Sequence, residues 1–595
     1  MFLRSHRRMK NGKEHRYYSI EESRRLQSGR VVQRRVLYLG EINDGQQVAW
    51  RKTLEVFDEQ QHSYTTLSLF PEDRGVPAGT VDGLQVKLSE MKLRRARPYG
   101  NCWLGCELWR QLELDRFWEQ KLERGREEVS WAQVLELLVI NRLMDPGSEF
   151  RVHRQWFDQS AMDVLLGVDF AVAEKDRLYR CLDRILKHKG DLFVHLQQRW
   201  RNLFDVSFEV LLYDLTSTYG EGEAERHPKA KRGYSRDGRP DCKQVIVALV
   251  ITPEGFPLAY QVMDGNTSDK TTLRGFLTKI EELYGKARRV WLMDRGIPTE
   301  AVLQEMRAAE RQMFYLVGTP KTRVSKYEKQ WLELPWRKVR DSVEVKLFSQ
   351  DGEMYVLAKS EGRQQKEIAM RRKKLARLLR KLRRMRKSLP KRDQLLLRIG
   401  AAKKETGRAF GFVKIRVPGK DEEVTRNTFR FHTDRNKLQD AQRRDGHYLL
   451  RTNLVAEDPA VLWDRYMQLT QIEAAFKCLK SELGIRPIYH QLEHRVEAHI
   501  LVAFLAYCLS VTLKHRLQVH APGLTPRAVL EKLASIQMLD VSFPTTDGRC
   551  LTMPRYTEPA DEVALLLHQL QLTLPNQPPP RLAALSSEPL PALKM

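Results

Sequence analysis

Three acidic residues stand where metal ligands are often found, two at the ends of predicted strands and one on a predicted helix. Asp214 ends the β-rich run SFEVLLYD, and Asp294 ends a second run, RVWLMD. Glu473 lies in TQIEAAFKCLKSEL, where apolar residues recur at helical spacing. A lone aspartate after a strand is usually a turn former or a helix cap. Three carboxylates brought together would supply oxygen ligands, which favour Mg²⁺ or Mn²⁺ over zinc.

The helix that carries Glu473 is predicted to present a polar, largely cationic face. At about 100° per residue, one arc of about 80° contains Tyr466, Leu469, Glu473, Lys477 and Lys480. The apolar residues of this stretch fall largely elsewhere and would pack against a core. One carboxylate among ammonium groups suits a metal ligand that faces a polyanion.

The strands before Asp214 and Asp294 belong to a pattern of three strands followed by alternating helices and strands. The predicted order is strands at 207–214, 243–251 and 256–262, a helix at 271–284, a strand at 289–294, a helix at 299–309 and a strand at 313–317. This is the order of an RNase H-like mixed sheet, whose first and fourth strands are neighbours. Asp214 and Asp294 should therefore lie a few ångströms apart. Three carboxylates can hold two divalent ions about 3.5–4 Å apart for phosphoryl transfer. Asp264 and Asp269 read as turn formers.

The overall charge indicates a polyanionic partner. The chain has 102 Lys and Arg against 76 Asp and Glu, a net charge of +26, so nucleic acid is the first candidate and an anionic membrane surface the second. The apolar segment 499–513 is shorter than the roughly 20 residues of a membrane span and reads as a buried core helix. Seven scattered cysteines read as thiols in a reducing compartment. The histidines at 432, 490, 494 and 499 show no cluster pattern and read as structural.

A very basic segment interrupts the predicted sheet. Residues 361–398 hold sixteen Lys or Arg and three acids. Ile368, Leu375, Leu382 and Leu389 recur every seven residues, which predicts a helix with an apolar seam that ends at Pro390. One interpretation is a solvated helix packed on its own hairpin partner. We favour an insertion that contacts DNA, because packing alone leaves the charge density unexplained.

The fold class predicted is α/β, with an RNase H-like core of five mixed strands and helices. The predicted segments are 1–95, a β-rich basic module; 96–205, a helical region; 206–320, the first part of the core; 321–454, a basic β/α insertion; 455–520, the second part of the core with Glu473; and 521–595, a C-terminal region with a Pro-rich tail. The helical region is either a reader of DNA ends of the helix-turn-helix type or a purely structural domain.

These blocks together resemble a family, the insertion-sequence DDE transposases of the cut-and-paste group. That group carries the signature Tyr-x2-Arg-x3-Glu-x6-Lys. Tyr466, Glu473 and Lys480 stand at the matching intervals, and Leu469 occupies the arginine position. The segments YDLTSTY, MDRGIP, PLAYQVMDGNTSDKTTL, DGHYLLRTN and RPIYH…HRVEAHI are also similar to the family's blocks. The resemblance covers residues 206–514.

The resemblance implies Mg²⁺-dependent cleavage at the ends of a mobile element and strand transfer into target DNA. Asp214, Asp294 and Glu473 would be the catalytic metal ligands, and Mn²⁺ would substitute for Mg²⁺. DNA phosphates would be bound by Tyr466, Lys477, Lys480 and Arg295. The implied partners are the double-stranded element ends and target DNA, bound by a homodimer in the cytoplasm near the nucleoid, with no membrane.

Two other functions remain open at this point. A stand-alone RNase H-like nuclease would keep the fold and cleave without joining, although simple cleavage needs no long basic insertion. A transposase relic that only binds DNA would keep the charge and lose catalysis. Leu469 in the arginine position favours the relic, whereas the presence of all three acids favours the enzyme.

Overall fold

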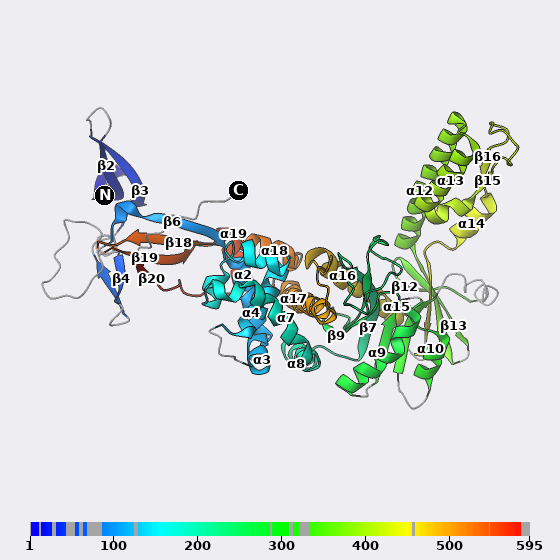
Figure 1. The fold of residues 1–595 in the computed structure, drawn as a ribbon, viewed down its shortest axis with the longest axis horizontal. Helices are drawn as coiled ribbons and strands as arrows, with labels where there is room; N and C mark the ends of the chain where they lie inside the picture. Colours follow the sequence, from blue (N-terminus) through cyan, green and yellow to red (C-terminus); the bar gives the residue numbers. More distant parts are fainter. Residues whose placement is uncertain are drawn as a thin grey trace. The chain divides into compact units, whose positions relative to one another are not determined.

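The computed structural model describes fifteen stretches of the chain, residues 2–10, 13–25, 31–42, 54–58, 63–67, 86–123, 129–267, 269–285, 288–294, 296–308, 313–319, 334–350, 352–454, 458–546 and 548–584. The chain contacts divide it into two compact units. One unit comprises Met1–Gly100, Gln159–Val164 and Lys532–Met595, and the other comprises Asn101–Asp158 and Leu165–Glu531. Figure 1 shows both units coloured along the sequence.

The first unit is built mainly of antiparallel sheets. Strands β1 (Phe2–Lys10), β2 (Lys13–Arg25) and β3 (Val31–Gly40) form one sheet, and β4 (Leu54–Asp58) pairs with β5 (Ser63–Leu67). β2 pairs antiparallel with both β1 and β3. A further sheet has the order β20-β19-β18-β6, from Arg581–Ala584, Arg549–Tyr556, Gln537–Pro544 and Lys92–Pro98.

The two ends of the chain meet in this last sheet, although the sequence placed them in separate segments. β6 pairs antiparallel with β18, and α19 (Asp561–Gln569) follows β19. The Arg97 guanidinium is 1% exposed and lies 3.3 Å from Asp163 and 3.2 Å from Asp540. A buried guanidinium needs such carboxylate partners, because an uncompensated charge in the interior is costly.

The helical part of the second unit surrounds one long apolar helix, α17 (Glu493–His520). The other helices with most of their residues in this unit are α2 (Gly100–Gln111), α3 (Leu114–Lys121), α4 (Trp131–Met144), α5 (Glu149–Arg151), α7 (Lys175–Ile185), α8 (Lys189–Phe204) and α18 (Pro526–Leu533). Most of α6 (Met162–Leu166) belongs to the first unit. By length and composition α17 is apolar enough to cross a membrane, but 94% of its most apolar window is buried inside the protein. It packs against α4 and α7, so the prediction of a core helix is confirmed.

A nine-stranded mixed sheet forms the other half of this unit, in the order β12-β13-β14-β17-β11-β10-β7-β8-β9. Its core strands are β7 (Val210–Tyr219), β8 (Gln244–Ile251), β9 (Pro257–Asp264), β10 (Arg289–Met293) and β11 (Met313–Thr319), with helices α9 (Asp269–Tyr284) and α10 (Glu300–Arg307) between the later ones. β7 pairs antiparallel with β8 and parallel with β10. This order is consistent with an RNase H-like core, and the predicted neighbourhood of the first and fourth strands is confirmed.

The prediction of a five-stranded sheet was wrong, because strands of the insertion extend it. The added strands are β12 (Arg337–Arg340), β13 (Val343–Gln350), β14 (Glu353–Ser360) and β17 (His447–Thr452). β17 pairs antiparallel with β11 and β14. Without β17, the edge of β11 would expose unpaired backbone groups. Most residues of β14 and β17 are buried, as expected of strands inside a sheet.

The rest of the insertion is a helical hairpin with its own small core. α12 (Glu361–Ser388) and α13 (Arg392–Thr406) are followed by the paired strands β15 (Val413–Arg416) and β16 (Arg430–Thr433) and by α14 (Arg435–Arg443). The seam of α12 buries Leu378, Leu382 and Met385 against Leu395 and Ile399. The predicted helix and its stop before Pro390 are confirmed, and the seam packs against the second helix of the hairpin.

The predicted single helix around Glu473 is divided in the structure. α15 (Pro459–Met467) begins at the cap Asp458, and α16 (Leu469–Lys477) runs into a π-helical turn at Cys478–Glu482. At the junction the N–H of Gln471 donates to the carbonyl of Gln468 at 2.8 Å, the i to i+3 pattern of a 3₁₀ turn. Because the 3₁₀ and π turns have different periods, the 100° arithmetic fails for Tyr466 and Lys480.

Candidate active site

Asp214 and Asp294 follow residues that are paired on two parallel strands. Tyr213 on β7 is paired with Met293, the last residue of β10. Asp214 follows Tyr213 within β7, and Asp294 is the first residue after β10. Residues opposite one another on neighbouring strands point to the same face of a sheet. Asp214 is half-buried within β7, with Oδ1 accepting from the N–H of Leu215 at 2.7 Å, whereas Asp294 is exposed. The strand prediction located both residues, but β7 continues five residues beyond Asp214 to Tyr219.

Glu473 reaches this region from α16, which packs against β7. Ile472, Ala475 and Phe476 bury the inner side of the helix, while Glu473 is exposed. The pKa of Tyr448, on β17, is raised, chiefly by burial, and the negative charge of Glu473 adds to the shift. The third acid therefore lies on an element in contact with the strand that carries the first.

Aromatic and cationic side chains flank Glu473. The ring of Tyr448 lies 5.8 Å from that of Tyr466 and 5.4 Å from that of Trp463. The guanidinium of Arg363, at the start of α12, lies 5.4 Å above the Tyr448 ring. The sequence suggested Tyr466 but missed Arg363 and Tyr448. Tyr448 belongs to the DGHYLLRTN block, whereas nothing local distinguishes Arg363 from the other basic residues of its helix.

The remaining predicted DNA contacts have different environments. Lys477 is exposed at the end of α16. Lys480 is only 12% exposed in its side chain, and its ammonium donates to Asp237 at 2.8 Å. Burial lowers the pKa of Lys480 despite that partner. Arg295 lies outside the described residues.

Asp237 is a third residue that the sequence analysis missed. Its side chain is 3% exposed and forms ion pairs with both Lys480 and Arg486. It lies in the long connection between β7 and β8, and the segment SRDG around it reads only as a turn. These ion pairs fasten that connection to the π turn after α16, so Lys480 positions the helix of Glu473.

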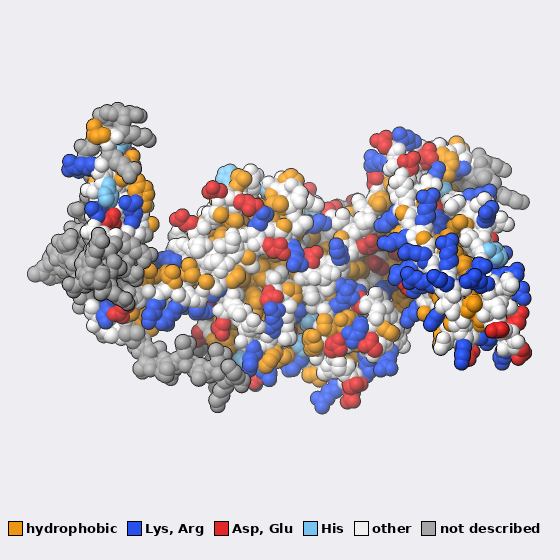
Figure 2. Space-filling model, turned by 90° about the horizontal axis from the view of Figure 1, so that it is seen from above, with side chains coloured by type: hydrophobic (Ala, Val, Ile, Leu, Met, Phe, Trp, Pro, Cys, Tyr) orange, Lys and Arg blue, Asp and Glu red, His pale blue; other side chains and the backbone are white. Residues whose placement is uncertain are grey.

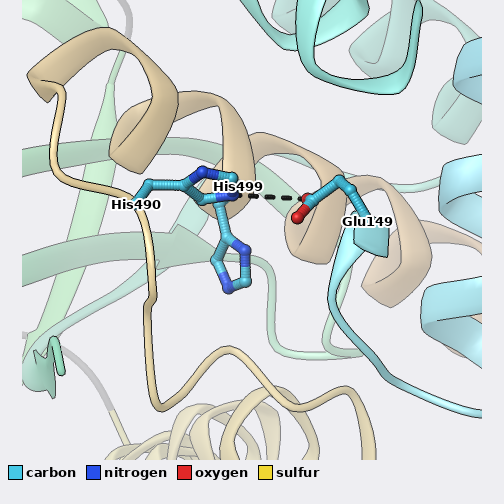
Figure 3. Close-up of side chains that lie close together, drawn as sticks. All are labelled: Glu149, His490 and His499. Atoms are coloured by element: carbon cyan, nitrogen blue, oxygen red, sulfur yellow. Dashed lines mark hydrogen bonds and ion pairs between the residues drawn. The ribbon is translucent and has the colours of Figure 1, made fainter. Parts of the chain in front are cut away.

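A buried cluster joins four segments of the chain, and Figure 3 shows the side chains from three of them, Glu149, His490 and His499. Nε2 of His490 lies 3.3 Å from the carboxylate of Glu149, and the side chains of both residues are less than 10% exposed. Nε2 of His499 lies 3.3 Å from the carbonyl of Ile485 and therefore carries the proton. Its Nδ1 faces the guanidinium of Arg142 at 3.5 Å. No local pattern in the sequence predicts this cluster, because its members come from α4, α5, the loop after the π turn and α17.

The cluster has the donor atoms of a metal site but not its charge balance. Ligand atoms of Glu149, His490 and His499 all lie within 4.8 Å of one another, and no other such group of three occurs in the described part of the chain. The buried guanidinium of Arg142 already balances the carboxylate of Glu149. A divalent ion would add two further positive charges beside it, and buried uncompensated charge is costly. We therefore interpret the cluster as a hydrogen-bonded support.

The three acids fit divalent cations that prefer oxygen. Their ligand atoms do not form a group within 4.8 Å. Two ions about 4 Å apart, each about 2 Å from its ligand oxygens, allow oxygens on opposite sides of the pair to lie up to about 8 Å from each other. Asp214 in β7, Asp294 directly after β10 and Glu473 on the helix packed against β7 are the residues that would hold such a pair. An all-carboxylate donor set suits Mg²⁺ or Mn²⁺.

Comparison with known proteins identifies the family. The family described as "Transposase DDE domain" matches residues 207–509, just over half of the 595 residues. The chain belongs to this DDE transposase family. The match begins before β7 and ends inside α17, so it includes Asp214, Asp294, Glu473 and the insertion.

The transposase was also compared with solved structures and curated sequences. It is similar to one chain in the "Cryo-EM structure of piggyBac transposase synaptic complex with hairpin DNA (SNHP)", with 7% sequence identity, a TM-score of 0.35, and coverage of 74% of this chain and 82% of that chain. No curated protein sequence matches the transposase.

Proposed function

We propose that this transposase cuts DNA at the ends of an insertion sequence and joins those ends to target DNA. The observation that carries the proposal is the parallel pairing of β7 with β10, because Asp214 follows Tyr213 and Asp294 follows its partner Met293 within the family match. Glu473 completes the set from α16, the helix packed on β7. The two strands and the helix that carry these carboxylates are far apart in the sequence and are brought into contact by the fold.

Asp214, Asp294 and Glu473 would hold two Mg²⁺ ions, or Mn²⁺ in their place. When bound, such ions activate a water or a 3′-hydroxyl and stabilise the leaving oxygen of the phosphodiester. The exposed ammonium of Lys477 lies one turn after Glu473 and would contact a phosphate near the scissile bond. Tyr466 and Arg295 are proposed for the same role. Lys480 would act mainly through its ion pair with Asp237.

The finer assignment rests on the signature around Glu473. Tyr466, Glu473 and Lys480 keep the spacing of the cut-and-paste group, with Leu469 in the arginine position. Arg363 lies close to Tyr448 and would supply a cation to this region in place of the missing arginine. Joining two element ends favours a homodimer on DNA, and the function places the protein in the cytoplasm near the nucleoid.

Cleavage of the element's own ends tests this function. A duplex carrying one terminus of the element that encodes the chain should be cut with Mg²⁺ and not with EDTA. Asp214→Ala, Asp294→Ala and Glu473→Gln should each lower the cleavage rate by at least 100-fold, because each removes a metal ligand, while affinity for the duplex stays within threefold. Glu482→Gln, the same change at an exposed residue nearby, is the matched control.

The products separate the proposal from its two rivals. A transposase joins the cut end to an added target plasmid, whereas a nuclease releases it without joining. A relic binds the duplex and cuts nothing. Wild-type-like cleavage by any of the three acid variants would show that the site is assigned wrongly.

A further inference from the structure

One face of α12 carries a row of cations that the packing of the helix does not use. At about 100° per residue, the seam residues Leu375, Leu378, Leu382 and Met385 fall within about 80° of one another. On the opposite side, a second arc of about 80° holds six exposed basic residues, Lys366, Lys373, Arg377, Arg380, Arg384 and Lys387. We call these six residues the α12 track.

Ion pairing inside the protein accounts for little of this charge. Arg377 pairs with Glu405 on α13, but within the described residues no acid pairs with the other five members of the track. Figure 2 shows a dense group of Lys and Arg side chains in the part of the view that the insertion occupies. Like charges this close repel one another, so such a row is stabilised when a polyanion covers it.

Helix α12, which carries the track, begins beside residues of the candidate active site. The first exposed cation of α12, Arg363, lies 5.4 Å above the ring of Tyr448, which in turn lies 5.8 Å from the ring of Tyr466. The negative charge of Glu473 also contributes to the raised pKa of Tyr448. From this end, α12 continues as one helix to Ser388, with the insertion core holding its far half against α13. The row of cations therefore leads outward from the catalytic acids.

We propose that the α12 track binds the DNA duplex on one side of the scissile phosphate. From Lys366 to Lys387 the helix rises about 32 Å, which corresponds to about nine base pairs at 3.4 Å each. Exposed cations spaced three or four residues apart, with one gap of seven between Lys366 and Lys373, can contact the phosphates of a duplex laid along this helix. Such contacts read no sequence. This inference rests on the proposed function and adds the path of the DNA to it.

Charge neutralisation on two faces of the same helix tests the path. The track variant combines Arg380→Gln, Arg384→Gln and Lys387→Gln. The matched control combines Arg372→Gln, Arg383→Gln and Arg386→Gln, three exposed arginines on the flank of α12, about 110° from the track. Both variants lose three positive charges from one helix. Binding is measured by fluorescence anisotropy with a labelled 30-base-pair duplex of arbitrary sequence, without divalent metal.

The track variant should lose about 100-fold in affinity at 0.1 M salt, and the slope of log K against log salt should fall by about 2.7, because three phosphate contacts no longer release counterions. The flank variant should lose less than threefold. Hydroxyl-radical footprinting on the element's own ends should show a protected tract of about nine base pairs beside the cleavage site, and the track variant should lose the part of this tract farthest from that site. Equal losses in both variants, or an unchanged footprint, would overturn the path.

The same measurements separate this inference from the proposed function. If the track variant binds like the wild type while Glu473→Gln abolishes cleavage, the DNA path is wrong and the function stands. If the wild type cuts no element end while the track variant alone loses affinity, the function is wrong and the DNA surface stands.

Discussion

The fold stabilises the negative charge of the buried Glu149 carboxylate. Burial by itself would raise the pKa of its carboxyl, but the hydrogen bond from His490 and the positive charge of Arg142 bring the pKa down to about 2. The carboxylate thus supports the loop after the π turn from α5. The same loop is bonded to the strand of Asp214, because the N–H of Ile488 donates to the carbonyl of Tyr219 at 3.0 Å.

This depressed pKa predicts a pH-dependent contribution to stability. A folded-state pKa below the ordinary value of 4.5 stabilises the fold above pH 4.5, by up to about 3 kcal/mol, and this contribution is lost as the pH falls from 4.5 towards 2. Glu149→Gln should therefore lower the urea unfolding free energy at pH 6, and the gap to the wild type should narrow below pH 4.5. Glu225→Gln, at an exposed site, should show no such gap. A gap that stays constant down to pH 3 would contradict the assignment.

At the scale of elements, the insertion contains two parts that behave differently. Its strands β13, β14 and β17 join the central sheet. The hairpin of α12 and α13 instead packs on its own cluster with the β15–β16 pair. The hairpin can unfold locally while the sheet stays folded, because the apolar residues of the hairpin core pack mainly on one another and not on the sheet.

Leu382→Ala tests that independence. Leu382 is fully buried in the hairpin core, and its truncation should cost about 2–5 kcal/mol through lost burial and the cavity left behind. By hydrogen exchange, amides of α12 and α13 should then exchange faster, while those of β7 and β10 keep their protection. Lys374→Ala, at an exposed position of α12, is the control. Equal loss of protection in the sheet would show that hairpin and sheet unfold together.

Elements with a local pattern were predictable from the sequence, and those fixed by distant contacts were not. The β-branched runs before Asp214 and Asp294 predicted β7 and β10, and the seven-residue repeat predicted α12. The break at Gln468 was missed because no glycine or proline marks it. The ion pair of Lys480 with Asp237 and the cluster of His490 with Glu149 join residues 243 and 341 positions apart, and no local pattern encodes such pairs.

At the scale of the whole molecule, the acids of the candidate site come from three separate stretches that only the fold brings together. The order of predicted strands was enough to place the strand of Asp214 beside the strand that precedes Asp294, because parallel neighbours in a mixed sheet follow from topology. The nine-stranded extent of that sheet was not predictable, because β17 pairs with β11 across more than 120 residues of sequence and no local pattern encodes that pairing.

A change of metal preference tests most directly that these acids hold the metal ions. Asp294→Cys replaces a hard carboxylate by a softer thiolate, which binds Mn²⁺ better than Mg²⁺. With Mg²⁺, cleavage of the element's ends should fall by at least 100-fold, and Mn²⁺ should restore it at least tenfold, whereas Asp294→Ala should recover with neither ion. Wild-type rates of Asp294→Cys with Mg²⁺ would contradict the assignment of Asp294 as a metal ligand, and with it the proposed active site.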